Sequence, residues 1–391
     1  MAAVVLAKGR DRRLKAGHLW VYAGEIASVD EGASPGDLVE VRDHRRRFLG
    51  RGTYNPASTI TVRLLSREPE EAVDRAFLDR RIAEALSYRA RVFPGETTLR
   101  VIHGEGDRLP GLVVDRYGAH LCLQIGTLGM ERLRPLLLEI LQERLHPAGI
   151  YERSDLSSRA HEGLPPAEGV IAGEVPEVVP VLLDGVEFRV RLAEAQKTGL
   201  FLDQRLNRQA LLPLSGGRTV LDAFCNTGGF GLYALRGGAQ SVLGVDISPI
   251  CVRRAREQAE ANGFSDRSEF VEANAFDFLH SLDREGRRFG IVILDPPAFT
   301  KSPRNLEGAR RGYKEINLRA LRILEPGGFL LTSSCSYHLS LEEFLSTLQE
   351  AVADSKRNVR LVSVRGQSPD HPICPGVPES SYLKFALFHV S

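Results

Sequence analysis

The chain has 391 residues, of which 43% are hydrophobic and 26% charged, and its formal net charge is +1. This length suits two or three domains, and the composition is that of an ordinary globular protein. No apolar run approaches the roughly 20 residues that span a bilayer, which argues against a membrane protein. The near-neutral charge neither requires nor excludes nucleic acid as a partner. Because the first residues also lack an apolar segment long enough for a secretory signal, we expect a cytoplasmic protein.

The five cysteines are widely spaced and include no Cys-x-x-Cys pair. Such spacing favours thiols in a reducing compartment over a disulfide framework or a zinc site. We therefore expect free thiols and no bound metal.

Residues 1–70 contain short strand-like runs broken by Gly, Asn and Pro, which predicts a compact β-barrel. Residues 8–15 hold five Lys or Arg and one Asp, and residues 45–47 are all arginine. Clustered basic side chains bind phosphates without reading base sequence. A solvated charged surface is the simpler alternative.

Residues 71–180 change in character and predict a separate α+β domain. The stretch 71–93 has no Gly or Pro and places apolar residues near helical spacing. Strand-like runs and a second amphipathic helix follow. The Pro-, Gly- and Glu-rich stretch 163–180 is the expected boundary.

Residues 181–391 predict the third domain. From about residue 217, apolar strand-like runs alternate with helical segments, which favours an α/β fold with a doubly wound, mostly parallel sheet. Four of the apolar runs end abruptly, at Asp222, Asp246, Asp295 and Cys335. Ligands of such sheets bind beyond the carboxyl ends of the strands. We therefore expect one crevice that receives these four side chains.

The loop CNTGGFG after Asp222 indicates the kind of ligand. It is neither the Gly-x-Gly-x-x-Gly of dinucleotide sites nor a P-loop. S-adenosylmethionine has no phosphate but carries a sulfonium and an amino-acid head, which Gly228 and Gly229 would let the backbone approach. Asp222 offers negative charge to the cationic groups, and Asp246 is placed to accept both ribose hydroxyls. In the simpler alternative, the glycines only make a turn and Asp246 caps a helix.

Asn274 follows the third strand, where it would read the adenine amino group or simply cap a helix. Asp295 precedes two prolines, which lack N–H donors and hold a rigid extended turn. Such a turn can support a flat base and form one hydrogen bond to its edge. Phe299 would stack on a base or fill the core.

Cys335 separates two types of reaction. A cysteine in an apolar strand is usually an inert core residue, but this one lies at a strand end among serines and close to His338. Such surroundings favour the thiolate, which is the attacking species. Carbon 5 of cytosine accepts a methyl group only after a nucleophile adds to carbon 6, whereas methylation of nitrogen needs no covalent step. We interpret Cys335 as that nucleophile.

Together these segments resemble the bacterial cytosine-5 methyltransferases of large-subunit (23S) ribosomal RNA. That family joins an amino-terminal PUA domain to a class I, Rossmann-like, S-adenosylmethionine-dependent methyltransferase domain. The resemblance covers nearly the whole chain. It is carried by GRDRRLKAGHLWVYAGEI, PGDLVEVRD, FLGRGTYNP, QKTGLFLDQRLNR, VLDAFCNTGGF, GVDIS, LDPPAFTK, SSCSYH, and the closing HP and ESSYLKF.

The resemblance implies S-adenosylmethionine as cofactor, Cys335 as nucleophile and Asp295 as the partner of the base edge. It implies that QKTGLFLDQR closes over the cofactor; read without the resemblance, this string is a linker. The implied cofactor contacts are Thr198, Phe201, Asp203, Arg205, Asp222, Phe224, Asn226, Thr227, Gly228, Asp246, Ile247, Asn274, Ala275 and Asp295. The implied RNA contacts are Arg10, Arg12, Arg13, Lys15, Phe299 and Lys301. A homodimer is possible by analogy.

Two positions depart from the family pattern. Asn274 stands where class I methyltransferases often carry Asp, and Ala298 stands where many RNA cytosine-5 enzymes carry a second cysteine that releases the product. The base that removes the proton from carbon 5 is therefore unidentified. The alternative functions are a base-nitrogen RNA methyltransferase and, in another class, a catalytically inactive RNA-binding assembly factor. A nicotinamide oxidoreductase is disfavoured by the loop.

Overall fold

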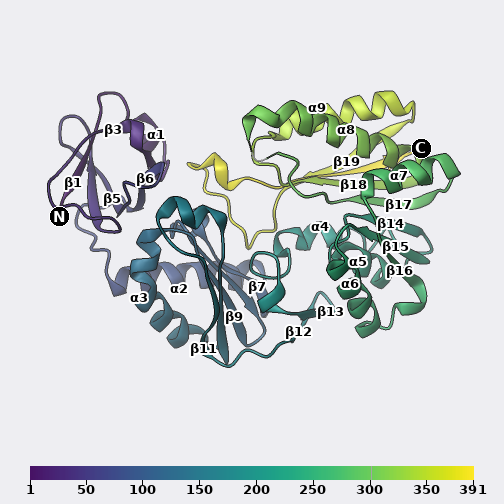
Figure 1. Ribbon diagram of the computed structural model, residues 1–391, viewed down its shortest axis with the longest axis horizontal. Coiled ribbons are helices and arrows are strands. Elements are labelled where there is room, and N and C mark those ends of the chain that lie inside the picture. The colour runs from purple at the N-terminus through teal and green to yellow at the C-terminus, as the bar shows by residue number, and fades with distance from the viewer. Residues whose placement is uncertain (301) are drawn as a thin grey trace. The chain divides into compact units, whose positions relative to one another are not determined.

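The computed structural model describes residues 1–300 and 302–391 (Figure 1). The chain forms two compact units. Unit 1 comprises Met1–Val181, Arg189–Leu202 and Pro369–Ser380, and unit 2 comprises Leu182–Phe188, Asp203–Ser368 and Ser381–Ser391. Two segments of the third expected domain thus belong to unit 1, and the domain boundaries at residues 70 and 180 stay predictions. None of the helices in the described ranges is long and apolar enough to cross a membrane.

Unit 1 begins with a six-stranded sheet in the order β2-β6-β5-β4-β1-β3. Its strands pair antiparallel except for β1 and β4, which are parallel. Alternate residues of β4 face inward, so Val39 and Val41 are buried in one cluster with Val4 and Leu64. The first residues therefore form the β-rich structure that was predicted. The elements are β1 (Ala3–Leu6), α1 (Arg12–Lys15), β2 (Trp20–Tyr22), β3 (Ile26–Val29), β4 (Leu38–Arg42), β5 (Phe48–Tyr54) and β6 (Ile60–Ser66).

The second sheet of unit 1 has five strands in the order β11-β10-β9-β8-β7. Helix α2 starts at Asp74, whose side chain accepts a hydrogen bond from the Phe77 backbone N–H, and it confirms the helix predicted over 71–93. Helix α2 contacts α3 and β7, and its Phe77 and Ile82 are buried. The elements are α2 (Arg75–Val92), β7 (Thr98–His103), β8 (Leu112–Tyr117), β9 (His120–Ile125), α3 (Leu128–Leu145), β10 (Gly149–Ser154) and β11 (Ala167–Gly173).

The sheet of unit 2 has seven strands in the order β16-β15-β14-β17-β18-β20-β19. Strands β14 to β18 are mutually parallel, and β20 pairs antiparallel with β18 and β19. The strand order reverses between β14 and β17, and this switch point is where open α/β sheets bind ligands. The predicted doubly wound, mostly parallel sheet is confirmed. Its strands are β14 (Thr219–Ala223), β15 (Ser241–Asp246), β16 (Ser268–Glu272), β17 (Phe289–Leu294), β18 (Leu324–Ser334), β19 (Val359–Arg365) and β20 (Lys384–Val390).

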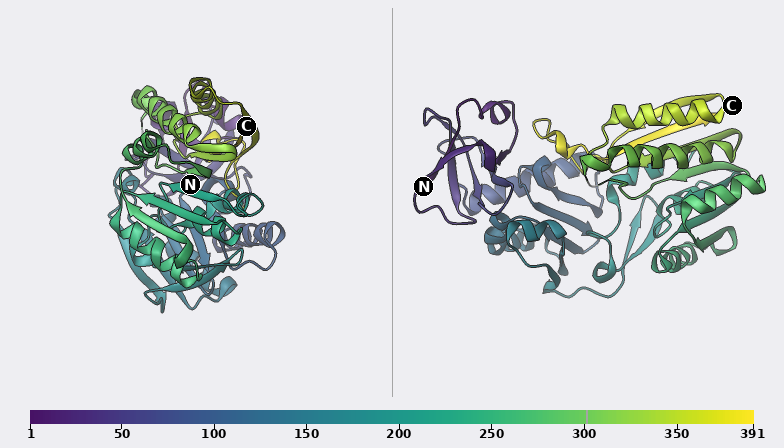
Figure 2. Two further views of the ribbon diagram at one scale, coloured as in Figure 1. Left: turned by 90° about the vertical axis from the view of Figure 1, so that its right-hand side faces the viewer. Right: turned by 45° about the horizontal axis from the view of Figure 1, so that its top comes forward.

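Helices cover both faces of this sheet (Figure 2). Helices α5 and α6 pack on β14, β15 and β16, whereas α8 packs on β17 and β18 beside α9. Ser248 caps α6 with Pro249 in its first turn, and Ser340 and Glu343 form a capping box at α9. The helices are α4 (Arg205–Gln209), α5 (Gly229–Arg236), α6 (Pro249–Ala261), α7 (Ala275–Glu285), α8 (Leu306–Arg322) and α9 (Leu341–Ser355); β12 (Val179–Leu183) and β13 (Val186–Val190) form a separate hairpin.

Candidate cofactor and catalytic site

The candidate site lies at the carboxyl ends of four neighbouring parallel strands in unit 2. Asp222 belongs to β14 and Asp246 ends β15, while Asp295 and Cys335 directly follow β17 and β18. The order β15-β14-β17-β18 makes these strands adjacent, so the four side chains share one edge of the sheet. Parallel strands that are covered on both faces contain apolar runs, as in β17, where every residue is buried.

The loop after β14 is strained and held by Asp246. Phe224, Asn226 and Gly228 all have left-handed backbone, with φ values of 66°, 50° and 82°. Non-glycine residues rarely adopt this conformation, and such strain is typical of functional loops. The carboxylate of Asp246 accepts hydrogen bonds of 2.9 Å from the backbone N–H groups of Asn226 and Ser248. These two hydrogen bonds fix the loop, and each carboxylate oxygen retains a second lone pair for a hydroxyl donor.

Asp222 is buried with one unsatisfied oxygen. Its Oδ2 accepts a 2.9 Å hydrogen bond from the Gly231 backbone N–H, whereas its Oδ1 is buried and has no partner among the described residues. Burial raises the pKa of Asp222 to about 7, and the charges of Asp295 and Asp246 add to that shift. A cationic ligand would satisfy the orphan oxygen and favour the ionised form.

Asp295 is positioned by the segment that precedes α4. Gln204 Nε2 donates hydrogen bonds to Asp295 Oδ1 at 2.8 Å and to Ser333 Oγ at 3.3 Å. Asn207 Nδ2 donates to Gln204 Oε1 at 2.7 Å, which fixes the orientation of the amide. Burial, helped by the nearby charge of Asp203, raises the pKa of Asp295 to about 6. This carboxyl group therefore titrates near neutrality and can either donate or accept a hydrogen bond.

Cys335 is half-buried and lies in a polar turn. The Tyr313 hydroxyl forms hydrogen bonds with Ser334 Oγ at 2.9 Å and Ser336 Oγ at 3.0 Å, on either side of the cysteine. Lys384 faces Ser334 across β18 and β20, and its ammonium donates to the Ser336 carbonyl at 2.7 Å. Burial lowers the pKa of Lys384 to about 8, while the charge of Cys335 opposes that shift. A buried cation thus neighbours the thiol.

Other predicted cofactor contacts of unit 2 lie around these strand ends. Ile247 is 70% exposed beside Asp246, and Ala275 is buried at the start of α7. Asn274 is exposed and caps α7 by accepting a hydrogen bond from the Phe276 N–H, which is the simpler of its two interpretations. Thr227 is half-buried in the strained loop. The roles of these residues in cofactor binding stay predictions.

The segment 196–208 is divided between the two units. In unit 1, Thr198 is hydrogen-bonded to Asp115 and Arg100, and Lys197 stacks over the Phe201 ring at 5.2 Å. In unit 2, the Tyr382 hydroxyl donates to Asp203 Oδ2 at 2.7 Å. Arg205 is also in unit 2, where its Nη2 pairs with Asp184 at 2.6 Å. Arg205 therefore has a structural partner, and its contact with a cofactor stays a prediction.

The predicted RNA contacts have mixed surroundings. Arg10 and Arg12 are exposed, whereas Arg13 stacks on Tyr22 at 4.6 Å and Lys15 pairs with Asp11. Phe299 packs on Tyr313 with ring centroids 4.5 Å apart, in an aromatic cluster that also contains Phe224 and Phe276. This packing favours the core interpretation of Phe299. Lys301 lies outside the described residues.

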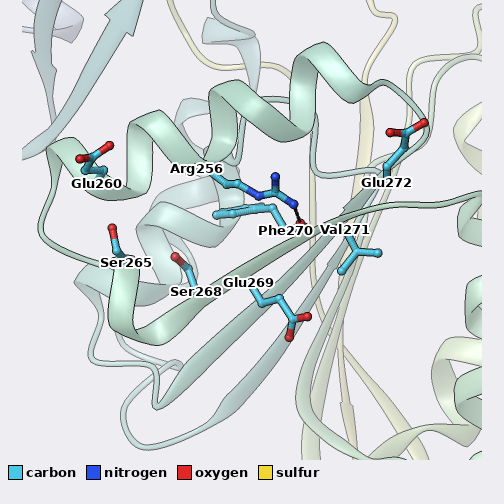
Figure 3. Close-up of a pocket in the computed structure, with 8 residues that line it drawn as sticks. All are labelled: Arg256, Glu260, Ser265, Ser268, Glu269, Phe270, Val271 and Glu272. Carbon is cyan, nitrogen blue, oxygen red and sulfur yellow. Dashed lines mark hydrogen bonds between the residues drawn. The ribbon is translucent and has the colours of Figure 1, made fainter.

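A separate pocket of about 460 Å³ lies between α6 and the edge strand β16 (Figure 3). Three carboxylates, Glu260, Glu269 and Glu272, line it, and the guanidinium of Arg256 donates to the Phe270 carbonyl. None of its lining residues was predicted as a site residue, and its one guanidinium already has a partner. The strand ends described above, and not this pocket, combine orphan polar atoms with shifted pKa values.

Four residues near the strand ends were missed by sequence reasoning: Gln204, Arg208, Tyr313 and Lys384. Gln204 and Arg208 lie in the string QKTGLFLDQRLNR and Lys384 in ESSYLKF, so their segments were noted but not these side chains. Arg208 is buried beside Gly229 at the start of α5. No local sequence pattern marks these four residues, because each meets the site through a contact with a residue distant in sequence.

Comparisons with known proteins agree with this geometry. Residues 4–67 match the model of a PUA-like domain, and residues 159–388 match that of an S-adenosylmethionine-dependent methyltransferase. The ribosomal RNA large subunit methyltransferase I of Shewanella denitrificans is 40% identical over 97% of both chains. That of Photobacterium profundum is 40% identical over 99% of both.

Solved structures show the same fold. A protein from Streptococcus mutans, described as a putative SAM-dependent methyltransferase, aligns over 100% of both chains with a TM-score of 0.85 and 20% identity. Another protein, described as a putative methyltransferase and solved as a complex with SAH, aligns over 100% of both chains with a TM-score of 0.86 and 20% identity.

The doubly wound sheet, the strained loop and the matched model define an S-adenosylmethionine-dependent methyltransferase. More narrowly, the chain belongs to the ribosomal RNA large subunit methyltransferase I family. Its site fits the cofactor, because the orphan Oδ1 of Asp222 suits a cationic group and the lone pairs of Asp246 suit ribose hydroxyls.

Proposed function

We propose that this enzyme forms 5-methylcytosine in large-subunit ribosomal RNA through a covalent adduct with Cys335. The observation that carries the proposal is a half-buried thiol at the end of β18, adjacent to the strand that presents Asp295 and next to the ammonium of Lys384. Thiol, acid and cation are the groups that addition to a pyrimidine requires. The curated relatives are named for large-subunit ribosomal RNA, which supports the substrate.

The first step is addition of the Cys335 thiolate to carbon 6 of cytosine. A bond forms between Sγ and carbon 6, and the electron pair of the 5,6 double bond moves to carbon 5. Lys384 stabilises the thiolate before attack. Asp295, in its protonated form, donates a hydrogen bond to N3 and thereby draws electron density from the ring.

The second step is transfer of the methyl group, which S-adenosylmethionine supplies when bound. Carbon 5 forms a bond to the methyl carbon, and the electron pair of the broken sulfur–carbon bond stays on the sulfonium sulfur. The proton on carbon 5 then passes to water. Its electron pair restores the 5,6 double bond, and Cys335 leaves as a thiolate.

The remaining groups bind the substrates. Asp222 and Asp246 hold the cationic head and the ribose of the cofactor. Exposed Arg10 and Arg12 bind phosphates of the RNA without reading sequence. The expected homodimer is part of the proposal and is tested by light scattering coupled to size-exclusion chromatography.

The second candidate function is methylation of a base nitrogen, favoured by the rigid turn at Asp295. Incubation of deproteinised 23S RNA with labelled S-adenosylmethionine, followed by digestion and mass spectrometry, separates the two. We expect 5-methylcytidine from the wild type and none from Cys335→Ala. Cys374→Ala, which removes another half-buried thiol, is the matched control and keeps the activity.

Three results would overturn the proposal. An N-methylated nucleoside would favour the second candidate, and normal 5-methylcytidine from Cys335→Ala would exclude the covalent route. Binding of S-adenosylhomocysteine without any methylation of RNA would favour an inactive assembly factor. Thermal unfolding of Cys335→Ala shows whether lost activity comes from lost structure.

A further inference from the structure

Arg208 is a buried cation with unsatisfied donors. Its side chain lies in α4 and the residue is 5% exposed. Its Nε and Nη1 atoms are buried and have no hydrogen-bond partner among residues 1–300 and 302–391. Burying guanidinium N–H donors without partners is costly, and such donors call for an explanation, of which a ligand is one.

The neighbouring Arg205 differs from Arg208 in having a carboxylate partner. It is as buried as Arg208, but its guanidinium pairs with Asp184 at 2.6 Å, and Tyr233 donates to the same carboxylate at 2.6 Å. Arg205 therefore holds α4 to the β12–β13 hairpin turn. The orphan donors of Arg208 are not explained by such a structural role.

The guanidinium of Arg208 lies against the first turn of α5. A side chain at Gly229 would place its Cβ 3.0 Å from Nε and 3.1 Å from Cζ of Arg208, so the guanidinium would have to shift to admit it. The ring of Phe230 packs with its centroid 5.7 Å from Cζ. The amino-terminal N–H groups of α5 add partial positive charge at this place. An anion is therefore the ligand that this corner favours.

The rest of the site restricts which anion fits. The charge of Arg208 acts on both Asp222 and Asp295 and lowers the pKa of each against the effect of burial. A multiply charged phosphate would face these carboxylates and Asp246 at one strand edge. A zwitterion would instead place a carboxylate toward Arg208 and an ammonium toward the orphan Oδ1 of Asp222.

We infer that Arg208 binds the carboxylate of the methionine part of the cofactor, with the amino terminus of α5 as a second donor. Arg208 is then the residue that distinguishes an amino-acid head from an amine. This inference rests on the cofactor class of the family and is independent of Cys335 and of the methylated atom.

The test compares S-adenosylhomocysteine with its decarboxylated analogue, which lacks only the carboxylate, by isothermal titration calorimetry. The wild type is expected to bind the analogue about 30-fold more weakly, as loss of a hydrogen-bonded charge pair predicts. In Arg208→Met this discrimination falls below about threefold. Arg208→Lys, which keeps the charge but loses the planar donors, is intermediate.

Arg218→Met is the control, because Arg218 is not a predicted site residue. It removes a half-buried guanidinium of the same unit that donates to the Gly327 carbonyl at 3.1 Å, so we expect a lower melting temperature and unchanged discrimination between the two ligands. Equal affinity of the wild type for both ligands would overturn the inference without need of any variant. Discrimination that survives in Arg208→Met, or that is lost in Arg218→Met, would overturn it as well.

Discussion

The side-chain amide of Gln204 donates a 2.8 Å hydrogen bond to the carboxylate of Asp295. These residues are 91 positions apart, and the bond ties the segment before α4 to the end of β17. Gln204 also donates a hydrogen bond to Ser333 of β18, two residues before Cys335. One amide therefore links the carboxyl ends of β17 and β18, after which Asp295 and Cys335 follow. The segment before the sheet thus builds part of the catalytic edge.

Replacing Gln204 by Leu tests this link. The hydrogen bond from Gln204 lowers the pKa of Asp295, so its loss moves that pKa above its value of about 6. If protonated Asp295 is the donor, activity is lost as pH rises through this pKa, and the alkaline limb of the kcat profile shifts to higher pH. We also expect kcat to fall about tenfold, because the carboxyl group loses its orientation.

The control for that experiment is Gln240→Leu, since Gln240 is exposed in the same unit. Its profile should match that of the wild type. An acid limb that shifts in Gln204→Leu, with the alkaline limb unmoved, would show that Asp295 acts as an acceptor.

Lys384 should control the reactivity of Cys335. In Lys384→Met we expect alkylation of Cys335 by iodoacetamide at pH 7 to slow about tenfold, because the thiolate loses its neighbouring cation. Rates are measured by mass spectrometry of the Cys335 peptide between pH 6 and 10. Lys384→Arg should restore most of the rate.

Lys314→Met serves as the comparison, because Lys314 lies on α8 and pairs with Glu350 and Asp354 of α9, in the helix layer and away from Cys335 in sequence. An unchanged rate in Lys384→Met would contradict the assigned role.

We expect the ionisation of buried Asp222 to lower the free energy of unfolding above neutral pH. Its pKa is about 7 in the folded chain, whereas the ordinary pKa of an aspartate side chain is 3.8, so between these values the folded state binds more protons. Stability therefore falls as pH rises through this window, by up to about 1.4 kcal/mol per unit. We expect Asp222→Asn to unfold at a higher temperature than the wild type at pH 8, with the difference vanishing near pH 4.

The same substitution should weaken binding of S-adenosylmethionine at pH 8, because its ammonium loses a negative partner. Calorimetry in buffers of different ionisation enthalpy should also show proton release on binding near pH 7 in the wild type alone. Proton uptake would be inconsistent with the assigned role of Asp222.

Gly228 should be intolerant of a side chain. Its φ of 82° disfavours any L-residue, and a Cβ would lie 3.3 Å from the Cβ of Ala255. Gly228→Ala is expected to lower the free energy of unfolding by about 1–2 kcal/mol and to weaken cofactor binding. Gly263 is the control, because it has a similar φ of 69° but open space around it. Gly263→Ala therefore tests the backbone strain alone: it should lower the free energy of unfolding by about 1 kcal/mol and leave cofactor binding intact. Equal binding by both variants would argue against a tight loop.

The sheet and its strand ends could be predicted from the sequence because they are local patterns. Buried runs such as FGIVIL mark parallel strands, and each polar residue that ends a run marks the ligand edge. Helix caps at Ser248 and Ser340 are likewise local. The sequence therefore allowed Asp222, Asp246, Asp295 and Cys335 to be predicted as residues of the candidate site.

The supporting residues could not be predicted, because their roles come from pairing between distant segments. Lys384 reaches Cys335 only through the register that sets it opposite Ser334. Tyr313 meets the serines around Cys335 because α8 packs on β18. The sequence alone does not show that Arg205 and Arg208 have different roles. In the fold, Arg205 pairs with Asp184, whereas Arg208 lies against Gly229.

The most direct test of the covalent mechanism is mass spectrometry of the enzyme trapped on large-subunit RNA that contains 5-fluorocytidine. Fluorine at carbon 5 leaves no proton to remove, so the bond between Cys335 Sγ and carbon 6 would persist after methyl transfer. We predict one adduct, on the Cys335 peptide, with the mass of the fluorinated nucleotide plus a methyl group. No adduct, or an adduct on another residue, would contradict the mechanism.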